Sequence, residues 1–223
     1  VTQWIIPGVL FPVSEGYLDR VLPVLGVHLK IGWWRWKTPP PQYPWVKNIV
    51  SESTYNADLK EDFEEYWHKS SLYKNVRKFR NRCNDFELKV NPPGGAEWVI
   101  RNSEAKWRSP TVSITPDLDE RILVSEFWQP EGLQHTLLLY DHDVPIAGGT
   151  MIVHGKDVVA GVIYADPKYD WHGVMYKIID CSFHWASSMG YERIDLGGSY
   201  DYKARWAPEY GEKIKFDVYP STS

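Results

Sequence analysis

Cysteine is scarce in this sequence, and long apolar runs are missing. The two cysteines, Cys83 and Cys181, are too few and too far apart for a disulfide framework, and neither has a Cys or His neighbour at a metal-binding spacing. No apolar run reaches the roughly 18 residues of a membrane span. The proline-interrupted start also lacks the pattern of a signal peptide. We therefore expect a cytoplasmic protein with no membrane contact.

Several motifs of catalysis are also missing. The sequence has no GxSxG nucleophile motif and no Walker A loop, and none of its seven histidines forms an i, i+4 pair that would suit a helical metal site. The net charge of -4 gives no overall attraction for nucleic acid, so any contact with a polyanion must come from a local patch. We expect neither a catalytic metal nor a covalent nucleophile.

What is plentiful is tryptophan, with 12 residues in a chain of 223. Three of them, including Trp33 and Trp36, precede a proline-rich turn near the N-terminus. This cluster predicts either an aromatic wall around a ligand or simply a packed apolar lobe. With 43% hydrophobic residues, the chain can bury one sizeable core without disulfides. We expect two parts, an irregular Trp/Pro-rich lobe over residues 1–58 and a folded domain over residues 59–223.

The folded domain shows both helix and strand periodicity. A helix is predicted from residue 59 to the turn at 91–95, with Leu72, Val76 and Phe79 on its apolar face and Arg77 and Lys78 opposite. Residues 96–133 predict only a short helix or strand. Three strands of an antiparallel meander follow, at 135–140, 145–153 and 157–164. A largely apolar helix is predicted at 174–189, a short strand at 193–196 and a final alternating strand at 213–218.

One segment, Met189 to Trp206, combines a helix end, a short strand, paired glycines and a Tyr-Lys step. This order resembles the closing segment of the GNAT-like acyltransferase domain in the FemAB and CelD-like branch. The basic helix around residues 64–83 resembles the helix that precedes the core in that branch. The resemblance covers residues 60–206 and implies an α/β fold, with a GNAT-like mixed sheet and a central helix, beside the N-terminal Trp/Pro-rich lobe.

The resemblance also implies an N-acyltransferase, which moves an acyl group from a coenzyme A thioester to an amine by direct attack. Donor phosphates would then contact the main chain at the start of the central helix, at Trp171, His172, Gly173 and Val174. The usual Gly-rich pattern is not intact there, and a plain helix N-terminus capped by Asp170 is the other reading. The amine acceptor would be a small molecule, a peptide or a sugar derivative.

Three residues of the closing segment are candidate catalytic groups. Tyr202 is placed to give a proton to the leaving group, and Lys203 to hold a phosphate or carboxylate by its charge. Asp195 would accept the amine proton or hydrogen-bond the amides of Gly197 and Ser199. Tyr202 and Lys203 are equally compatible with a packing and capping role.

The basic helix face leaves two alternatives open. Arg77 and Lys78 would bind an aminoacyl-tRNA in a FemAB-like aminoacyl transferase, or the phosphates of a nucleotide-linked substrate. Without catalysis, the same face would make an RNA- or nucleotide-binding protein. A solvated surface is the common outcome for such a face. The sequence does not indicate an oligomeric state.

Overall fold

The computed structural model describes residues 4–6, 29–34, 46–70, 72–107, 118–198 and 200–218. The chain forms two compact units. The larger comprises residues 56–197 and 201–208, and the smaller comprises residues 1–55, 198–200 and 209–223. The strand β3 (Val46–Asp58) contributes its last residues to the larger unit.

The larger unit is built on a mixed sheet with the strand order β3-β8-β7-β6-β5-β4. The pairs β4–β5, β5–β6 and β6–β7 are antiparallel, whereas the pair β7–β8 is parallel. The bounds of the five complete strands are β4 (Glu87–Val90), β5 (Gln134–Asp141), β6 (Val144–His154), β7 (Asp157–Ala165) and β8 (Arg193–Gly198). The predicted meander and the predicted short strand after the central helix are therefore confirmed.

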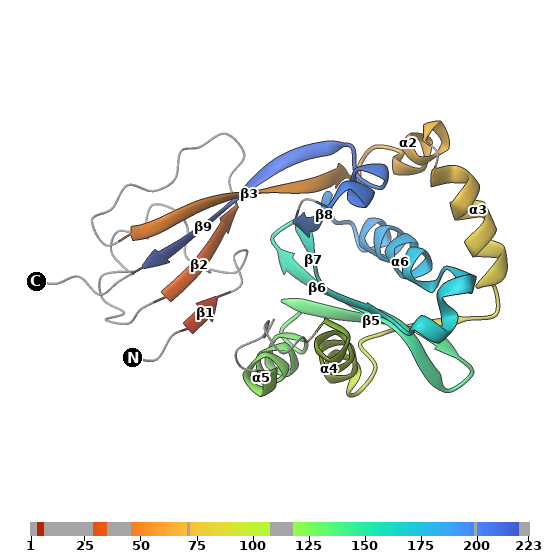
Figure 1. Ribbon diagram of the computed structural model, residues 1–223, viewed down its shortest axis with the longest axis horizontal. Helices are drawn as coiled ribbons and strands as arrows, with labels where there is room; N and C mark the ends of the chain where they lie inside the picture. The colour runs from red at the N-terminus through yellow and green to blue at the C-terminus, as the bar shows by residue number, and fades with distance from the viewer. Residues whose placement is uncertain are drawn as a thin grey trace, which may run out of the picture. The chain divides into compact units, whose positions relative to one another are not determined.

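Helices cover both faces of this sheet (Figure 1). The helices α4 (Gly95–Trp107) and α5 (Leu118–Trp128) lie on one side, and the central helix α6 (Val174–Ser188) lies on the other. Two shorter helices, α2 (Phe63–Lys69) and α3 (Leu72–Arg82), follow each other along the outside of α6. The parallel β7–α6–β8 crossover needs such a helix to return the chain to the same end of the sheet.

The α6 side of the sheet holds an aromatic core. Trp67, Phe183 and Trp206 are almost completely buried, and the Trp67 and Trp206 rings meet edge to face with centroids 5.0 Å apart. The Trp67 indole N–H donates to the Trp206 carbonyl at 2.9 Å. The buried indole therefore ties α2 to the segment that follows β8.

A polar cluster bridges the helices on this side. Arg80 of α3 donates to both carboxylate oxygens of Asp180 at 2.6 and 3.1 Å, and to Glu64 of α2 at 2.7 Å. His184 lies 2.9 Å from Glu64 and 3.4 Å from Asp180. Burial alone would raise the pKa of Asp180, but hydrogen bonds from His184 and Arg80 outweigh it and hold that pKa below its usual value.

The structure corrects the sequence analysis between residues 59 and 133. The predicted single helix is two helices that break at Ser70, whose hydroxyl accepts from the Leu72 amide. The turn predicted at 91–95 does not end that helix, because the edge strand β4 comes first. Residues 96–133, for which the sequence predicts only a short helix or strand, contain most of helix α4 and all of helix α5.

The smaller unit contains β1 (Trp4–Ile6), β2 (Leu29–Trp34), β9 (Glu209–Val218) and most of β3, in the order β1-β2-β9-β3. β1 and β2 are parallel, and β2 and β9 are antiparallel. Trp33 pairs with Ile214 across this sheet. Trp36 and the proline-rich turn lie outside the described residues, so the aromatic wall stays a prediction.

Candidate active site

The two parallel strands β7 and β8 separate part-way along their length. They pair at only three positions, ending with Val159 opposite Asp195. β7 then continues to Ala165 and β8 to Gly198. We call this divergence the opening and define it by the residues beyond the Val159–Asp195 pair, 161–165 of β7 and 196–197 of β8. A sheet opened in this way exposes backbone groups that a ligand can pair with.

A bulge in β7 borders the opening. The β6–β7 register shifts between Gly149 and Met151, and the hydroxyl of Thr150 accepts from the Val162 amide at 2.9 Å. A Cβ on Gly161 would lie 2.6 Å from the Thr150 hydroxyl oxygen, so only glycine fits there. The bulge bends β7 where it leaves β8.

Asp195, Gly197 and Lys203 together fix the exit of β8. Gly197 has a φ of 66°, a left-handed conformation that favours glycine. The Asp195 carboxylate accepts from the Gly197 amide at 2.6 Å, as the sequence analysis anticipated. The Lys203 ammonium donates to the carbonyls of Leu196 and Gly197 at 2.6 and 3.1 Å. Two of the three candidate catalytic residues therefore meet at Gly197.

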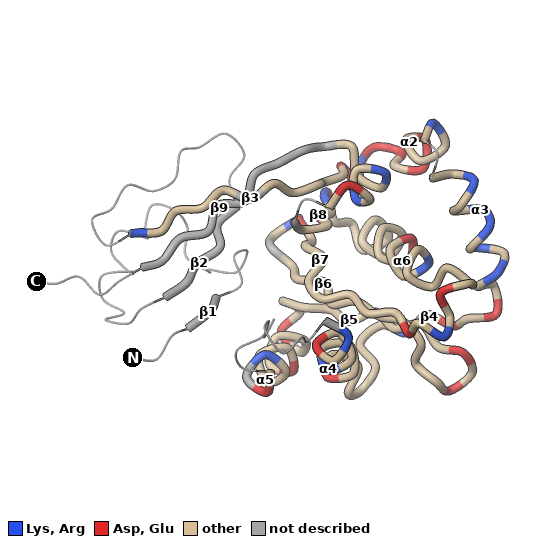
Figure 2. Tube along the Cα trace, in the orientation of Figure 1, with Lys and Arg blue, Asp and Glu red and all other residues tan. Residues whose placement is uncertain are grey.

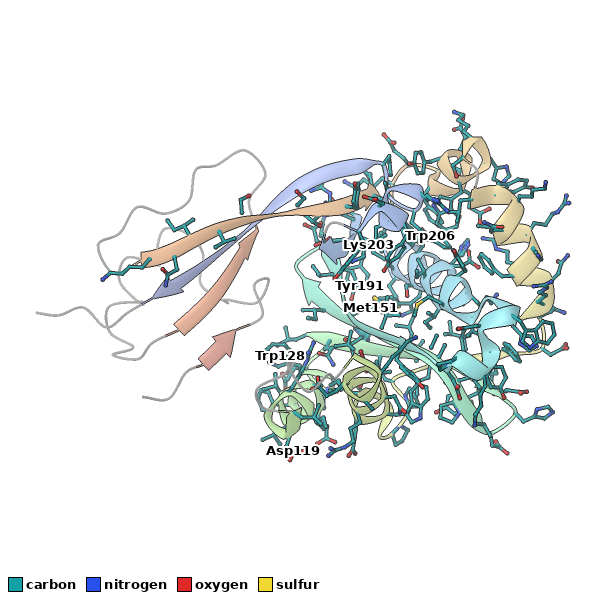
Figure 3. The ribbon with its side chains drawn as sticks, viewed as in Figure 1. Asp119, Trp128, Met151, Tyr191, Lys203 and Trp206 are labelled. Carbon is teal, nitrogen blue, oxygen red and sulfur yellow. The ribbon has the colours of Figure 1, made fainter. Side chains whose placement is uncertain are left out.

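Tyr202 and Lys203 lie on the short helix η4 (Asp201–Arg205), which contacts α2 (Figure 3). The Tyr66 hydroxyl donates to the Ala204 carbonyl at 2.5 Å, so η4 is fixed next to the aromatic core. Tyr202 is 46% exposed, and the Lys203 ammonium lies 6.0 Å from its ring centre. The phenol is therefore open to solvent and close to a fixed positive charge.

Tyr164 is a further phenol of the β7 segment that borders the opening. Trp98 packs edge to face against its ring, with centroids 5.3 Å apart. Burial, and after it the negative charge of Asp166, raises the pKa of Tyr164. This phenol stays protonated at neutral pH and acts as a hydrogen-bond donor rather than as a base.

The loop before α6 contains the predicted phosphate contacts. It forms the short helix η3 (Pro167–His172) and then Gly173, which has a φ of 83° and is the N-cap of α6. No side chain caps α6, so the predicted capping by Asp170 is wrong; the Asp170 carbonyl instead accepts from the Gly173 amide at 3.0 Å. That amide is therefore already used within the loop.

Helix α3 packs directly on this loop. A Cβ on Gly173 would lie 2.9 Å from the Cβ of Phe79. Arg82 donates to the Trp171 carbonyl at 2.6 Å, and the Cys83 thiol donates to the His172 carbonyl at 3.4 Å. Trp171 nonetheless stays 65% exposed. Gly173 is required by the packing of α3, whatever the loop binds.

The basic face of α3 is exposed (Figure 2). Arg77 and Lys78 point to solvent, as do Lys74 and Arg82. Arg80 differs, because it is held in the cluster with Asp180 and Glu64. The predicted separation of apolar and basic faces is confirmed.

One buried polar residue escaped the sequence analysis. Asn56 of β3 is 1% exposed, although its strand looks in sequence like an ordinary alternation of polar and apolar residues. Only the strand neighbours, which the fold supplies, show that this asparagine faces inward. Among the described residues, no group of three or more His, Cys, Asp or Glu side chains is arranged to hold a metal ion.

No family model matches the sequence, and no curated protein matches it. Solved structures with a similar architecture do match. Among solved structures, FemX aligns with a TM-score of 0.58 and 9% identity over 73% of this chain and 61% of its own. The C-terminal domain of a protein designated lysylphosphatidylglycerol synthetase from Agrobacterium fabrum aligns with a TM-score of 0.57 and 12% identity, over 96% and 77%.

A third structure, L-PGS from Bacillus licheniformis, aligns with a TM-score of 0.53 and 12% identity over 78% of this chain and 62% of its own. This chain therefore spans about three fifths of FemX and of L-PGS. Among its described residues, no helix is both long enough and apolar enough to cross a membrane. Likeness at this identity concerns the fold, and on that basis the larger unit has the GNAT-like α/β fold shared with FemX and L-PGS.

Proposed function

We propose that this protein is an N-acyltransferase that transfers an acyl group to an amine at the opening between β7 and β8. The observation that carries the proposal is the early end of the β7–β8 pairing at Val159 and Asp195. The Asp195 carboxylate belongs to this last pair, and the Lys203 ammonium contacts the carbonyls of the next two residues, Leu196 and Gly197. A GNAT-like fold supports the same reading at the level of architecture.

The reaction requires one bond to form and one to break. The amine nitrogen attacks the acyl carbon, the new C–N bond forms, and the bond to the donor's sulfur or oxygen breaks. Asp195 would accept the proton that the amine loses, and Tyr202 would give a proton to the leaving group. The positive charge of Lys203 at the end of β8 would favour the negative charge that develops on the carbonyl oxygen.

The first candidate donor is a coenzyme A thioester, whose phosphates would contact the loop at Trp171–Val174. Two features of that loop weaken its binding of phosphate. The Gly173 amide is already used, and the side chain of Asp170 is exposed and negatively charged. Fewer free amides and a nearby carboxylate weaken a helix N-terminus as an anion site.

The second candidate donor is an aminoacyl-tRNA. Its specific support is the exposed basic face of α3, which includes Arg77 and Lys78 (Figure 2). Cations on one exposed face suit a phosphate backbone and predict strongly salt-dependent binding. The Trp171 side chain, exposed beside Arg82 with the guanidinium carbon 5.7 Å from the ring centre, adds a surface on which a base can stack.

The test is to offer both donors with a mixed set of amines and detect the acylated product by mass spectrometry. Acetyl-CoA and charged tRNA are supplied separately, and Lys203→Met serves as the matched variant because it keeps most of the length of the side chain but removes the charge. We expect one donor to give product with the wild type and much less with Lys203→Met. Tight RNA binding without product from either donor would favour the non-catalytic RNA-binding alternative.

The basic face supplies the control that separates the two donors. Replacement of both Arg77 and Lys78 by Gln should weaken tRNA binding and flatten its dependence on salt, because fewer counterions are released. The same variant should leave acetyl-CoA binding unchanged. Equal product formation from acetyl-CoA in the variant and the wild type, with no product from charged tRNA in either, would refute the aminoacyl-tRNA form.

A further inference from the structure

Asn56 carries a carboxamide that the described part of the protein leaves without a hydrogen bond. The residue is 1% exposed, and neither its Oδ1 nor its Nδ2 has a partner among the described residues. A buried polar atom left unpaired destabilises a protein, so natural structures rarely keep one without a purpose. Here both halves of one amide are in that position.

The register of β3 against β8 places Asn56. The Leu59 amide donates to the Glu192 carbonyl at 2.8 Å, at the point where β3 ends and β8 begins. The two neighbouring strands therefore run in opposite directions. Counting back along β3 and forward along β8 from this bond sets Asn56 opposite Asp195.

The burial pattern supports this register. Ala57 and Ile194, the adjacent pair, are completely buried on the α6 face, whereas Asn56 and Asp195 point to the other face. Asp195 pairs with Val159, Val159 with Ile152, and Ile152 with Gln134. The Gln134 side chain accepts from Ser125 of α5. Asn56 and Asp195 therefore lie on the α4 and α5 face, at the point where the opening begins.

We propose that Asn56 binds an α-amino-acyl group of the substrate, with Asp195 beside it. The Asn56 Oδ1 accepts an N–H of the amino group, and the Asn56 Nδ2 donates to the neighbouring carbonyl oxygen. The Asp195 carboxylate supplies the charge that favours an ammonium. This inference rests on the proposed acyl transfer at the same opening, and it assigns the substrate class that the opening receives.

The chemistry of the pair selects this group. A carboxamide with both halves available matches a partner that both donates and accepts. The adjacent carboxylate adds a preference for positive charge over a neutral amide. A plain alkylamine lacks the acceptor, and a simple amide lacks the charge. An α-amino group next to a carbonyl has both, whether it belongs to an aminoacyl donor or to the N-terminus of a peptide acceptor.

The test uses the side-chain NH₂ signals of Asn56 in NMR spectra of the ¹⁵N-labelled full chain. These signals are assigned by their absence in Asn56→Leu, which keeps the side-chain shape and removes both polar atoms. Glycinamide carries an ammonium and an amide carbonyl, ethylamine only the ammonium, and acetamide only the amide. We expect glycinamide to shift the Asn56 signals and to bind about tenfold more tightly than either of the other two.

Two further arms identify the source of the amino-acyl group. Puromycin carries an amino-acyl group on a nucleoside and represents the donor, whereas glycinamide added with coenzyme A represents the acceptor. Binding of puromycin at Asn56 in competition with glycinamide supports recognition of an aminoacyl donor. Joint binding of glycinamide and coenzyme A supports recognition of an acceptor.

Stability provides an independent readout. If the carboxamide is kept for a ligand, Asn56→Leu should melt at the same or a higher temperature than the wild type and lose glycinamide binding about tenfold or more. The control is Gln134→Leu, a buried amide whose Oε1 accepts from Ser125 and whose Nε2 has no partner among the described residues; this variant loses one hydrogen bond, so it should melt lower and bind glycinamide normally. Asn56→Asp keeps the shape without the donor and should also bind weakly.

Asn56 signals that none of the probes shifts would overturn the proposal, as would a lower melting temperature for Asn56→Leu with unchanged glycinamide binding. An enclosed water bonded to Asn56 in a crystal soaked with glycinamide, with no glycinamide there, would also overturn it. Binding is measured without turnover, so the two proposals can fail separately. Glycinamide bound at Asn56 in a protein that transfers no acyl group refutes only the acyltransferase function.

Discussion

The two faces of the larger unit's sheet differ in what they bury. The α6 face holds an aromatic core, and strand residues such as Met151, Val158 and Ile194 bury apolar side chains against it. On the opposite face, Asn56, Asp195 and the Thr136–Thr150 pair are buried although they are polar. Burial of apolar side chains stabilises the fold, whereas burial of polar ones does so only when they are paired. The α6 face thus holds the aromatic core, whereas the opposite face buries Asn56 and Asp195, two polar residues of the candidate site.

The largest effect on stability is expected on the α6 face. Trp67→Ala should lower the free energy of unfolding by about 3–5 kcal/mol, because it leaves a cavity against Trp206 and Phe183 and removes an indole hydrogen bond. Urea denaturation followed by circular dichroism measures the loss. A loss below about 1 kcal/mol would show that the aromatic core is not the main source of stability.

The second-largest loss in the free energy of unfolding is expected for the polar cluster on the α6 side. Arg80→Met removes the partner of the buried Asp180 and should cost about 2–3 kcal/mol at pH 7, less than for a fully buried pair because Arg80 is partly exposed. In the wild type the lowered pKa of Asp180 contributes stability that is present above its unfolded pKa and is lost as pH falls through the folded pKa.

The pH dependence sharpens this second prediction. Without Arg80, burial should raise the pKa of Asp180. The free energy of unfolding of the variant should therefore rise relative to that of the wild type as pH falls. Urea midpoints at pH 7 and at about pH 4 should therefore differ less between the two proteins at the lower pH. A constant difference across this range would argue that Arg80 stabilises by packing alone.

The thiols give a further test of the α6 side. Burial raises the pKa of both Cys83 and Cys181 to about 11. Near pH 8 the native protein should therefore contain about a hundredfold less thiolate than ordinary cysteines would. Labelling with iodoacetamide should be slow in the native state and fast in urea. Rapid native labelling at either cysteine would show that this side opens readily.

The smallest expected effect concerns the exposed phenol of Tyr202 on η4. Tyr202→Phe should lower turnover roughly tenfold and leave donor affinity unchanged, because the phenol acts on the leaving group only in the transition state. We expect less than the usual effect of a general acid because water can replace an exposed phenol. Equal turnover in the variant would remove Tyr202 from the mechanism.

The sequence predicted the parts of the fold that depend on periodicity. The meander, the α6 helix and the Asp195–Gly197 hydrogen bond follow from local patterns. β4 was missed because a four-residue edge strand with two exposed ends carries little alternation. The role of Arg80 was missed because Asp180 is 100 residues away along the chain. The burial of Asn56 depends on which strand lies beside it, and no local pattern contains that information.

If the opening between β7 and β8 is the reaction site, a bound donor should protect the backbone amides that border it. Hydrogen–deuterium exchange of the wild type, with and without the donor that gives product, measures this protection. We expect slower exchange of the backbone amides at residues 161–165 and 196–197 when the donor is bound. Protection confined to other segments, with the amides of the opening unchanged, would contradict it.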